Sequence, residues 1–474
     1  MPLPLRLYNT LRKRIEDFHP IEEGHVGLYT CGPTVYQYAH IGNLRTYIFE
    51  DFLIRTLRYF GYSIKHVMNV TDVGHLTDDA DGGEDKMLKG AREQRKSVWE
   101  IAEYYRGAFF RDLEALHILM PDITCRATEH IQDMIDLIGR IEKAGFTYQA
   151  GGNVYFDVRK TTDYGKLSGQ LLEDLKAGAR IAVDPNKKNP HDFALWFTRS
   201  KFEHQSMLWD SPWGRGYPGW HIECSAMSMK YLGEQFDIHC GGIDHVPVHH
   251  TNEIAQSEAA TGKKPWVRVW MHGEFLVMAK QKMAKSAGNF LTLSTLGEQG
   301  YDPMDYRYFC LGAHYRSPLQ FSYEALNGAR SGRMNMVQRI LRLKEANPGL
   351  EPAAAEKLEG RSGSLLRSFR EELANDLNVP KALVWFWELI KAEDIQPEQR
   401  LGAVLEMDRI LGLGIASIRS EELDPELLEL VEERELARRR KDFAGADEIR
   451  DRLQQLGILL EDTPAGPRWK KQKL

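Results

Sequence analysis

The spacing of hydrophobic residues changes from strand-like to helix-like near the N-terminus. In the segment HVGLYT, Val26, Leu28 and Thr30 fall on one side of an extended chain, which predicts a strand. After Asn43 the apolar residues recur at helical spacing up to Gly61, a residue type common just past helix ends. The pattern therefore predicts a connection from a strand to a helix between Thr30 and Asn43.

Strand and helix patterns keep alternating along the first half of the chain. The expected strands are 25–30, 63–70 and 266–278, and the expected helices are 44–60, 93–119, 220–232 and 249–261. Strands that alternate with helices favour an α/β fold with an open sheet. The acidic, glycine-rich segment 78–85 is typical of a loop.

Two stretches differ from this α/β pattern. Residues 121–218, with a helix expected at 127–145 and short strands at 153–158, look like an insertion. From about residue 322 only helices are expected, at 326–345, 362–375 and 380–391, and as charged helices within 424–457. The chain is expected to end in a turn followed by basic residues.

Length and composition restrict the class of protein. A chain of 474 residues is too long for one core and suffices for roughly three or four domains. The formal net charge is −6, so a nucleic acid would have to meet a local basic patch. No apolar stretch is long enough to span a bilayer, and five scattered cysteines favour a reducing compartment. We therefore expect a cytoplasmic protein without a membrane partner.

Two reactive side chains flank the predicted strand-to-helix connection. Cys31 comes where the strand ends, and His40 comes close to the helix N-terminus. Ligands of open α/β sheets bind beyond the carboxyl ends of the strands, and a helix N-terminus suits phosphate. Gly42 would let a phosphate or a ring approach the backbone closely. The alternative interpretation is a buried cysteine and a satisfied histidine in a tight turn.

Four residues from distant segments offer donor atoms that suit a zinc ion. They are Cys31, Cys224, His249 and Glu253. His249 and Glu253 are four residues apart and share a helix face. Spacing alone leaves other ligands open, namely His221, His239, Cys240, His245 and His250. A scatter of buried cysteines and structural histidines is equally compatible with the sequence.

A second candidate phosphate-binding segment is AKQKMAKSAGNF. It carries Lys282 and Lys285 beside Gly288. Lysines on a loop can close over a triphosphate and follow the charge as pyrophosphate leaves. Taken alone, the segment also fits a solvated basic loop.

Together and in this order, these motifs resemble those of class I cysteinyl-tRNA synthetases. CGPTVYQYAHIGNLRTY resembles the first signature of the family, KMAKSAGNF the second, and PGWHIECSAM the cysteine-pocket helix. GGIDHVPVHHTNEIAQSEA, YRSPLQFS and DFAGADEIRDRL also look like family segments. The resemblance covers essentially the whole chain.

The resemblance implies an α/β fold with a class I Rossmann-type catalytic domain that is interrupted by an insertion. A helical bundle and a small C-terminal anticodon-binding domain would follow. The implied division is 1–120 and 219–270 for the two Rossmann halves, 121–218 for the connective insertion, 271–325 for a linking fold with the KMAKS loop, 326–420 for the bundle and 421–474 for the anticodon-binding domain.

The resemblance also implies a reaction and its residues. L-cysteine would be activated with ATP as cysteinyl-adenylate and transferred to the 3′ end of cysteine tRNA by a monomer. Zinc, held by Cys31, Cys224, His249 and Glu253, would bind the substrate thiolate and so reject serine. Thr71, Trp220 and Asp244 match cysteine-pocket positions. The ATP-binding and catalytic positions are His40, Gly42, Asn43, Lys282 and Lys285, with Mg²⁺ on ATP.

Three positions depart from the usual family pattern. Asn43 stands where a second histidine is common, and an amide donates a hydrogen bond but never carries an imidazolium charge. Ala284 stands where serine is usual, and Thr251 stands where glutamate is commoner.

Two other functions remain open from the residues. One is a related cysteine ligase of thiol biosynthesis, which would need no anticodon module, and the other is a zinc-dependent RNA-binding paralogue without catalysis. Arg468, Lys470 and Lys471 beside Trp469 are candidate nucleic-acid contacts, because an aromatic ring can stack on an unpaired base. The basic run 438–441 either contacts tRNA phosphates or belongs to a solvated helix face.

Overall fold

The computed structural model describes most of the chain. The described residues are 3–74, 97–169, 184–199, 207–278, 291–419, 425–463 and 466–471. They form two compact units, Met1–Ala416 and Ser417–Leu474. The expected loop at 78–85 and the residues Lys282, Ala284, Lys285 and Gly288 lie outside the described residues.

The first unit is built on a parallel sheet of five strands. In spatial order they are β11 (Val267–Gly273), β10 (Phe236–Gly242), β3 (His25–Thr30), β4 (Ser63–Val70) and β5 (Ile123–Arg126). The chain extends the sheet from β3 to one side first and later to the other, so a switch point lies between β3 and β10. In open sheets the crevice beside such a point binds ligands. The predicted Rossmann-type α/β fold is confirmed.

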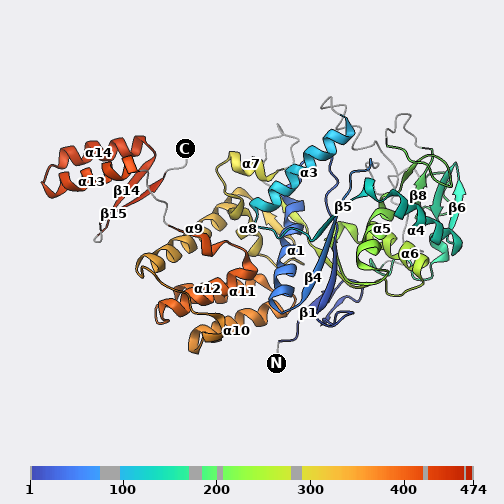
Figure 1. Ribbon diagram of the computed structural model, residues 1–474, viewed down its shortest axis with the longest axis horizontal. Coiled ribbons are helices and arrows are strands. Elements are labelled where there is room, and N and C mark those ends of the chain that lie inside the picture. The colour runs from blue at the N-terminus through green and yellow to red at the C-terminus, as the bar shows by residue number, and fades with distance from the viewer. Residues whose placement is uncertain are drawn as a thin grey trace. The chain divides into compact units, whose positions relative to one another are not determined.

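Helices cover both faces of this sheet (Figure 1). On one face packs α1 (Ile41–Tyr59), whose Phe49, Leu53 and Leu57 share a core with Leu28, Ile238 and Met271. On the other face lie α5 (Trp220–Leu232) and α6 (His249–Thr261), whose core includes Ile222, Met227, Ile254, Tyr29, Val67 and Phe236. The predicted helices 220–232 and 249–261 match the observed bounds.

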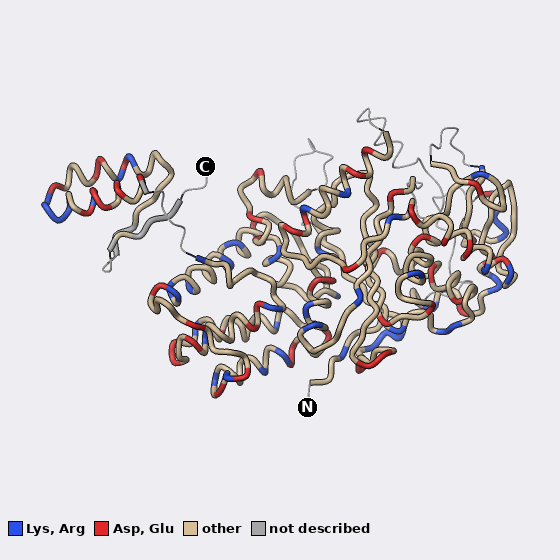
Figure 2. Tube along the Cα trace, viewed as in Figure 1, with Lys and Arg blue, Asp and Glu red and all other residues tan. Residues whose placement is uncertain are grey.

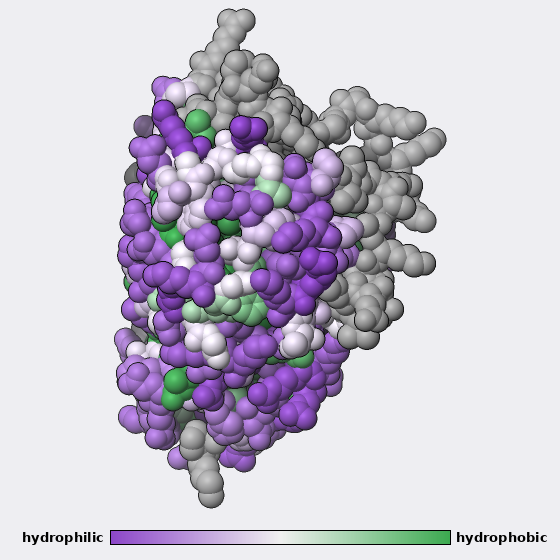
Figure 3. Space-filling view, turned by 90° about the vertical axis from the view of Figure 1, so that its right-hand side faces the viewer, coloured by the Kyte–Doolittle hydropathy of each residue, from purple (hydrophilic) through white to green (hydrophobic). Residues whose placement is uncertain are grey.

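The inserted segment forms a small α/β layer of its own. It contains α4 (Ile131–Lys143) and an antiparallel sheet of β6 (Thr147–Ala150), β7 (Asn153–Phe156), β8 (Phe193–Phe197) and β9 (Tyr217–Pro218). A short 3₁₀ turn at Ala127–Glu129 precedes α4, so the helix expected at 127–145 is shorter than predicted. The inserted segment lies on the right in Figure 1. The face of the molecule seen from that side is mostly hydrophilic, with small separated hydrophobic spots (Figure 3).

The sheet extends beyond the predicted end of its first half. β5 pairs with β4 in parallel, although it begins after residue 120, and β11 crosses the predicted boundary at residue 270. A four-residue strand carries too few alternating positions to stand out from a loop. The remaining domain boundaries stay predictions.

The helix expected at 93–119 is observed as α3 (Val98–Ala115). Ser97 and Glu100 form a capping box that sets its start, since each side chain bonds the backbone N–H of the other. The predicted C-terminal end at residue 119 was wrong, because the helix ends at Ala115. His117, just past the C-cap residue Leu116, adopts a positive φ of 53°, which takes the chain out of the helical path.

Short strands and helices surround the sheet and lead into a helical bundle. β1 (Arg6–Asn9) and β2 (Arg14–Asp17) form an N-terminal hairpin, and β12 (Leu276–Met278) pairs in parallel with β13 (Leu319–Phe321). The helices are α7 (Leu293–Glu298), α8 (Pro303–Leu311), α9 (Tyr323–Glu345), α10 (Gly360–Ala374), α11 (Val379–Lys391) and α12 (Pro397–Leu411). α12 was not among the predicted helices, although Leu401, Val404, Met407 and Leu411 stand at helical spacing.

The second unit contains two helices and a hairpin. These are α13 (Pro425–Arg439), α14 (Phe443–Gln455), β14 (Ile458–Thr463) and β15 (Gly466–Lys471). Its core consists of Val431, Leu453, Ile458 and Leu460. Both helices carry acidic and basic residues, and the last turn of α13 is basic with Arg438 and Arg439 (Figure 2). The basic residues that were expected after a turn lie on β15, a strand that the polar sequence did not predict.

Among the described residues, no helix has the length and apolar character needed to cross a bilayer. All five cysteines are buried, free thiols.

Candidate active site

Residues from four elements meet at the switch point of the sheet. Cys31 directly follows β3, and its backbone N–H donates to the carbonyl oxygen of Cys240 in β10 at 3.1 Å. Helices α5 and α6 begin nearby with Trp220 and His249. The predicted strand-to-helix connection therefore borders the segments that carry the other candidate ligands.

The structure brings the four predicted metal ligands together. Ligand atoms of Cys31, Cys224, His249 and Glu253 all lie within 4.8 Å of one another, and all four side chains are buried. His249 and Glu253, on one face of α6, place Nε2 3.0 Å from Oε1. Two sulfurs, an imidazole nitrogen and a carboxylate oxygen thus converge on one point.

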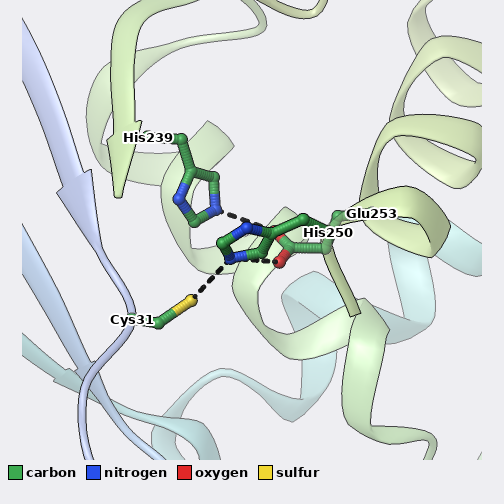
Figure 4. A group of neighbouring side chains, drawn as sticks. All are labelled: Cys31, His239, His250 and Glu253. Carbon is green, nitrogen blue, oxygen red and sulfur yellow. Dashed lines mark hydrogen bonds and ion pairs between the residues drawn. The ribbon is translucent and has the colours of Figure 1, made fainter. Parts of the chain in front are cut away.

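A second group of four shares two of these residues. Cys31 and Glu253 also lie within 4.8 Å of His239 and His250 (Figure 4). His239 Nε2 is 3.1 Å from Glu253 Oε2, and His250 Nε2 is 3.3 Å from Cys31 Sγ. The other open alternatives, His221, Cys240 and His245, belong to no such group within the described ranges. Geometry therefore narrows the alternatives to two overlapping ligand sets.

Further buried histidines hold these rings in place. His221 Nδ1 lies 3.0 Å from His249 Nδ1, and His250 Nδ1 lies 2.8 Å from His272 Nε2. Nδ1 of His272 lies 2.8 Å from Oγ1 of Thr10. Sequence reasoning missed His272 and Thr10, because neither stands near a motif. Partners of this kind fix ring orientation and tautomer around a metal.

Gly241 makes room for this packing. A Cβ there would lie 2.7 Å from Nδ1 of His245 and 2.8 Å from Cε1 of His250. Both distances are too short for a carbon contact. The glycine at the end of β10 therefore allows two imidazoles to lie against the strand backbone.

The four-residue cluster balances its own buried charges. Burial favours the neutral forms, but the attraction between His249 and Glu253 raises the pKa of His249 to about 10. Burial alone would raise the pKa of Glu253, but the nearby His239 and His249 lower it to about 2. A hydrogen bond from Cys31 lowers the pKa of Cys224 to about 7, whereas burial raises the pKa of Cys31. A divalent cation would replace the imidazolium proton and compensate the thiolates.

The donor set fits zinc. Oε1 of Glu253 is buried and lies close to His249, yet within the described part of the chain it makes no hydrogen bond of acceptable angle. An oxygen in this situation is available as a ligand. Two cysteine sulfurs with one histidine and one carboxylate are donors that zinc takes in proteins.

His40 caps the helix that opens beside this cluster. The ring Nδ1 of His40 accepts a hydrogen bond from the backbone N–H of Asn43 at 3.0 Å. The backbone N–H of His40 donates to Oδ1 of Asn43 at 3.3 Å. Burial lowers the pKa of the imidazole, and the nearby carboxylate of Asp244 opposes that shift. Because Nδ1 accepts, a neutral ring carries its proton on Nε2.

Gly42 permits this ring position. A Cβ at Gly42 would lie 2.9 Å from Nδ1 and 3.0 Å from Cε1 of His40. The close approach foreseen for Gly42 from the sequence is therefore made by a ring of the protein itself.

The predicted cysteine-pocket residues lie at different places around the cluster. The Trp220 ring is 4.3 Å from the His249 ring, between centroids, and so borders the cluster. Thr71 is buried and donates from Oγ1 to Glu223 Oε2 at 3.0 Å. Asp244 is exposed in a short turn after β10. Glu223, a fully buried carboxylate, was missed from the sequence despite its position beside Cys224.

Two known protein families match most of this chain. Residues 17–331 match the family model for the tRNA synthetases class I (C) catalytic domain, and residues 420–469 match that for the cysteinyl-tRNA ligase anticodon binding domain. A "Cysteine--tRNA ligase" of Treponema denticola is 54% identical over 99% of this chain and 100% of that protein. The chain belongs to the class I cysteinyl-tRNA synthetase family. The resemblance stated from its motifs is confirmed.

Another relative supports this family membership, and a solved structure shares the fold. Burkholderia lata has a "Cysteine--tRNA ligase 1" that is 47% identical over 98% of this chain and 97% of its own length. Mycobacterium tuberculosis methionyl-tRNA synthetase bound by methionyl-adenylate superposes with a TM-score of 0.53 at 17% identity, covering 82% of this chain and 90% of that one. At this identity the likeness shows the fold alone, which is that of class I synthetases.

Proposed function

We propose that this member of the cysteinyl-tRNA synthetase family activates L-cysteine with ATP and transfers it to the 3′ end of cysteine tRNA. In the first step the carboxylate of cysteine attacks the α-phosphorus of ATP, which gives cysteinyl-adenylate and releases pyrophosphate. In the second step the terminal ribose hydroxyl of the tRNA attacks the carbonyl carbon, and AMP leaves. The convergence of Cys31, Cys224, His249 and Glu253 beside the His40 helix carries the proposal.

The ligand cluster is proposed to read the substrate side chain. Cys31, Cys224, His249 and Glu253 would hold zinc, which supplies an open position for the cysteine thiolate and lowers its pKa. The serine hydroxyl is a far weaker acid and binds poorly among thiolates. Trp220 closes one side of the cluster, and Thr71 and Asp244 remain the predicted contacts to the rest of the amino acid.

The start of α1 is proposed to bind ATP. A carboxylate is already a nucleophile, so activation needs positioning and neutralisation of phosphate charge more than a base. His40 offers an Nε2–H, and Asn43 offers its amide N–H groups at a helix N-terminus. Because Gly42 has no Cβ, it leaves room for the ring of His40 at this position. Lys282, Lys285 and Mg²⁺ would compensate the triphosphate charge, as the family resemblance implies.

The match of residues 420–469 to an anticodon-binding domain weighs against the alternative ligase of thiol biosynthesis. Such a ligase transfers cysteine to a small amine and has no use for that module. The same match leaves the RNA-binding paralogue without catalysis as the second function to test. Pyrophosphate exchange that depends on cysteine would exclude that alternative.

Charging of purified cysteine tRNA tests the proposed function. The intact protein is assayed with radiolabelled cysteine, with serine as competitor, before and after treatment with a zinc chelator. The proposal predicts charging that excess serine does not inhibit and that zinc restores after chelation. A protein that binds the tRNA but forms neither cysteinyl-adenylate nor charged tRNA would contradict it.

A further inference from the structure

Arg45, in the second turn of α1, is aimed entirely at backbone carbonyl groups. Its Nη1 donates to Glu274 O at 2.7 Å and to Phe275 O at 2.5 Å. Its Nη2 donates to His314 O at 3.3 Å and to Ser317 O at 2.5 Å. The side chain is only 5% exposed. One guanidinium therefore joins α1 to two other chain segments.

The first of these segments leads from the central sheet to β12. Glu274 and Phe275 connect β11 with β12, and Phe275 O also accepts from the backbone N–H of Leu319 at 3.0 Å. In the sequence, Lys282 and Lys285 follow β12 by only a few residues. Arg45 thus fixes the strand that precedes the second family signature to the helix that carries the first.

The chain on the far side of that signature is also attached to the start of α1. The backbone N–H of Ile41 donates to Leu291 O at 2.8 Å, and His40 pairs with Thr292 in an isolated β-bridge. Both flanks of residues 279–290 are therefore hydrogen-bonded to α1 or to its cap. On the β12 side, Arg45 provides this attachment with its side chain.

The second segment bound by Arg45 is held from its opposite side by Asp376 of the helical bundle. His314 Nε2 lies 2.9 Å from Asp376 O. Tyr315 OH and Arg316 Nε donate to the Asp376 carboxylate at 2.6 and 2.7 Å. Residues 314–317 are therefore fixed between α1 and the bundle, which gives Arg45 a rigid support.

We propose that Arg45 is a positioning residue for the activation of the amino acid, one that sets β12 and residues 314–317 relative to His40. The inference rests on the proposed function. Lysine cannot fully replace Arg45. An ammonium group donates from a single point, whereas the planar guanidinium reaches carbonyls on two segments. Because Nη1 and Nη2 of Arg45 donate to backbone carbonyls, Arg45 acts through the placement of β12.

The test compares Arg45→Met and Arg45→Lys with the unmodified protein. Cysteine-dependent ATP–pyrophosphate exchange is measured per folded molecule, together with the KM for ATP, the KM for cysteine and the zinc content. We expect kcat to fall up to about 100-fold in Arg45→Met, as small misplacements of reacting groups do, and less in Arg45→Lys. The KM for cysteine and the zinc content should stay unchanged, because the ligand cluster is untouched.

Arg307→Lys is the matched control. Arg307 is also fully buried and donates to Leu411 O, to Leu116 O and to Asp51, away from β12. Its loss should lower the melting temperature and leave kcat per folded molecule unchanged.

Unchanged kcat and unchanged KM for ATP in both Arg45 variants would overturn the inference. If an arginine variant fails to fold, Asp376→Asn carries the test, since it loosens residues 314–317 from the bundle side. A lower kcat in Asp376→Asn supports the inference, and an unchanged kcat refutes it. Failure of the proposed function is distinguishable, because the unmodified protein would then show no cysteine-dependent exchange.

Discussion

The imidazole of His40 and the side chain of Asn43 form a reciprocal cap at the start of α1. Nδ1 of His40 accepts the backbone N–H of Asn43, and Oδ1 of Asn43 accepts the backbone N–H of His40. This arrangement gives a physical reason for asparagine where the family often has a second histidine. An amide accepts with its oxygen and keeps its N–H groups available for a ligand.

The first prediction concerns Gly42→Ala. The added Cβ would lie 2.9 Å from Nδ1 of His40, so the ring must leave its place over the helix start. We expect pyrophosphate exchange to fall by about 10- to 100-fold, because the phosphate donor proposed on His40 would be displaced. The crowding should also cost about 1–3 kcal/mol in the free energy of unfolding.

Gly328→Ala is the control for that substitution. Gly328 lies within α9, and a Cβ there would have no atom within 4 Å. Alanine should therefore stabilise the protein by about 0.5–1 kcal/mol and leave exchange unchanged. Equal exchange rates for the two alanine variants would contradict the role assigned to Gly42.

A second prediction concerns the pH dependence of stability through Glu50. Glu50 is 2% exposed on α1, and neither carboxylate oxygen has a hydrogen-bond partner among the described residues. Burial raises the pKa of Glu50 well above its ordinary value. The folded state therefore favours the protonated form. Its contribution to stability is complete below the unfolded pKa of about 4.3 and is lost as the pH rises through the folded pKa.

Glu50→Gln tests this prediction because glutamine stays neutral at every pH. Urea unfolding is measured at pH 5.5 and at pH 8.5. The variant should gain stability over the unmodified protein by more at pH 8.5 than at pH 5.5. The exposed Glu388→Gln serves as the control and should show no such difference. An equal gain for Glu50→Gln at both pH values would refute the prediction.

A third prediction separates the two overlapping ligand sets. If Cys31, Cys224, His249 and Glu253 hold the metal, Cys224→Ser removes a ligand and should abolish stoichiometric zinc binding. In that case His250 is not a ligand but a neighbour of the ligand Cys31. His250→Gln should then weaken zinc binding by about 10- to 100-fold without abolishing it. Zinc content after dialysis against graded chelator measures both effects. Retained zinc in Cys224→Ser with complete loss in His250→Gln would favour the second set.

A fourth prediction concerns the C-terminal unit. Residues Ser417–Leu474 form a compact unit with its own core of Val431, Leu453, Ile458 and Leu460. A chain that ends at Ala416 should therefore keep cysteine-dependent pyrophosphate exchange and lose most of its charging of cysteine tRNA. Charging at the full rate by the shortened chain would show that this unit is not needed for the tRNA.

The sequence predicts the strands and helices that carry strong periodicity. The strand before Cys31, the helix after His40 and the helices that begin at Trp220 and His249 are observed with nearly the expected bounds. The periodicity misses short elements. The four residues of β5 and the polar strand β15 carry too little pattern to be recognised, although pairing with a neighbour stabilises both.

The candidate site is predictable where residue type and motif coincide, and only there. Residue type made Cys31, Cys224, His249 and Glu253 candidates, but only the family resemblance singled them out from the neighbouring histidines and Cys240. Glu223, His272 and Arg45 could not be named, because their roles come from contacts with residues far away in the sequence. The choice between the two histidine-containing ligand sets also needs more than spacing, since both share Cys31 and Glu253.

The central claim is that a metal held by Cys31, Cys224, His249 and Glu253 recognises the thiol of the substrate. Pyrophosphate exchange with cysteine and with serine, measured on the zinc-loaded, zinc-stripped and reloaded protein, tests it most directly. The account predicts a preference for cysteine in kcat/KM well above the roughly 200-fold that a pocket reading size alone attains. That preference should disappear with the zinc and return on reloading. Unchanged exchange with cysteine after complete removal of zinc would contradict the account.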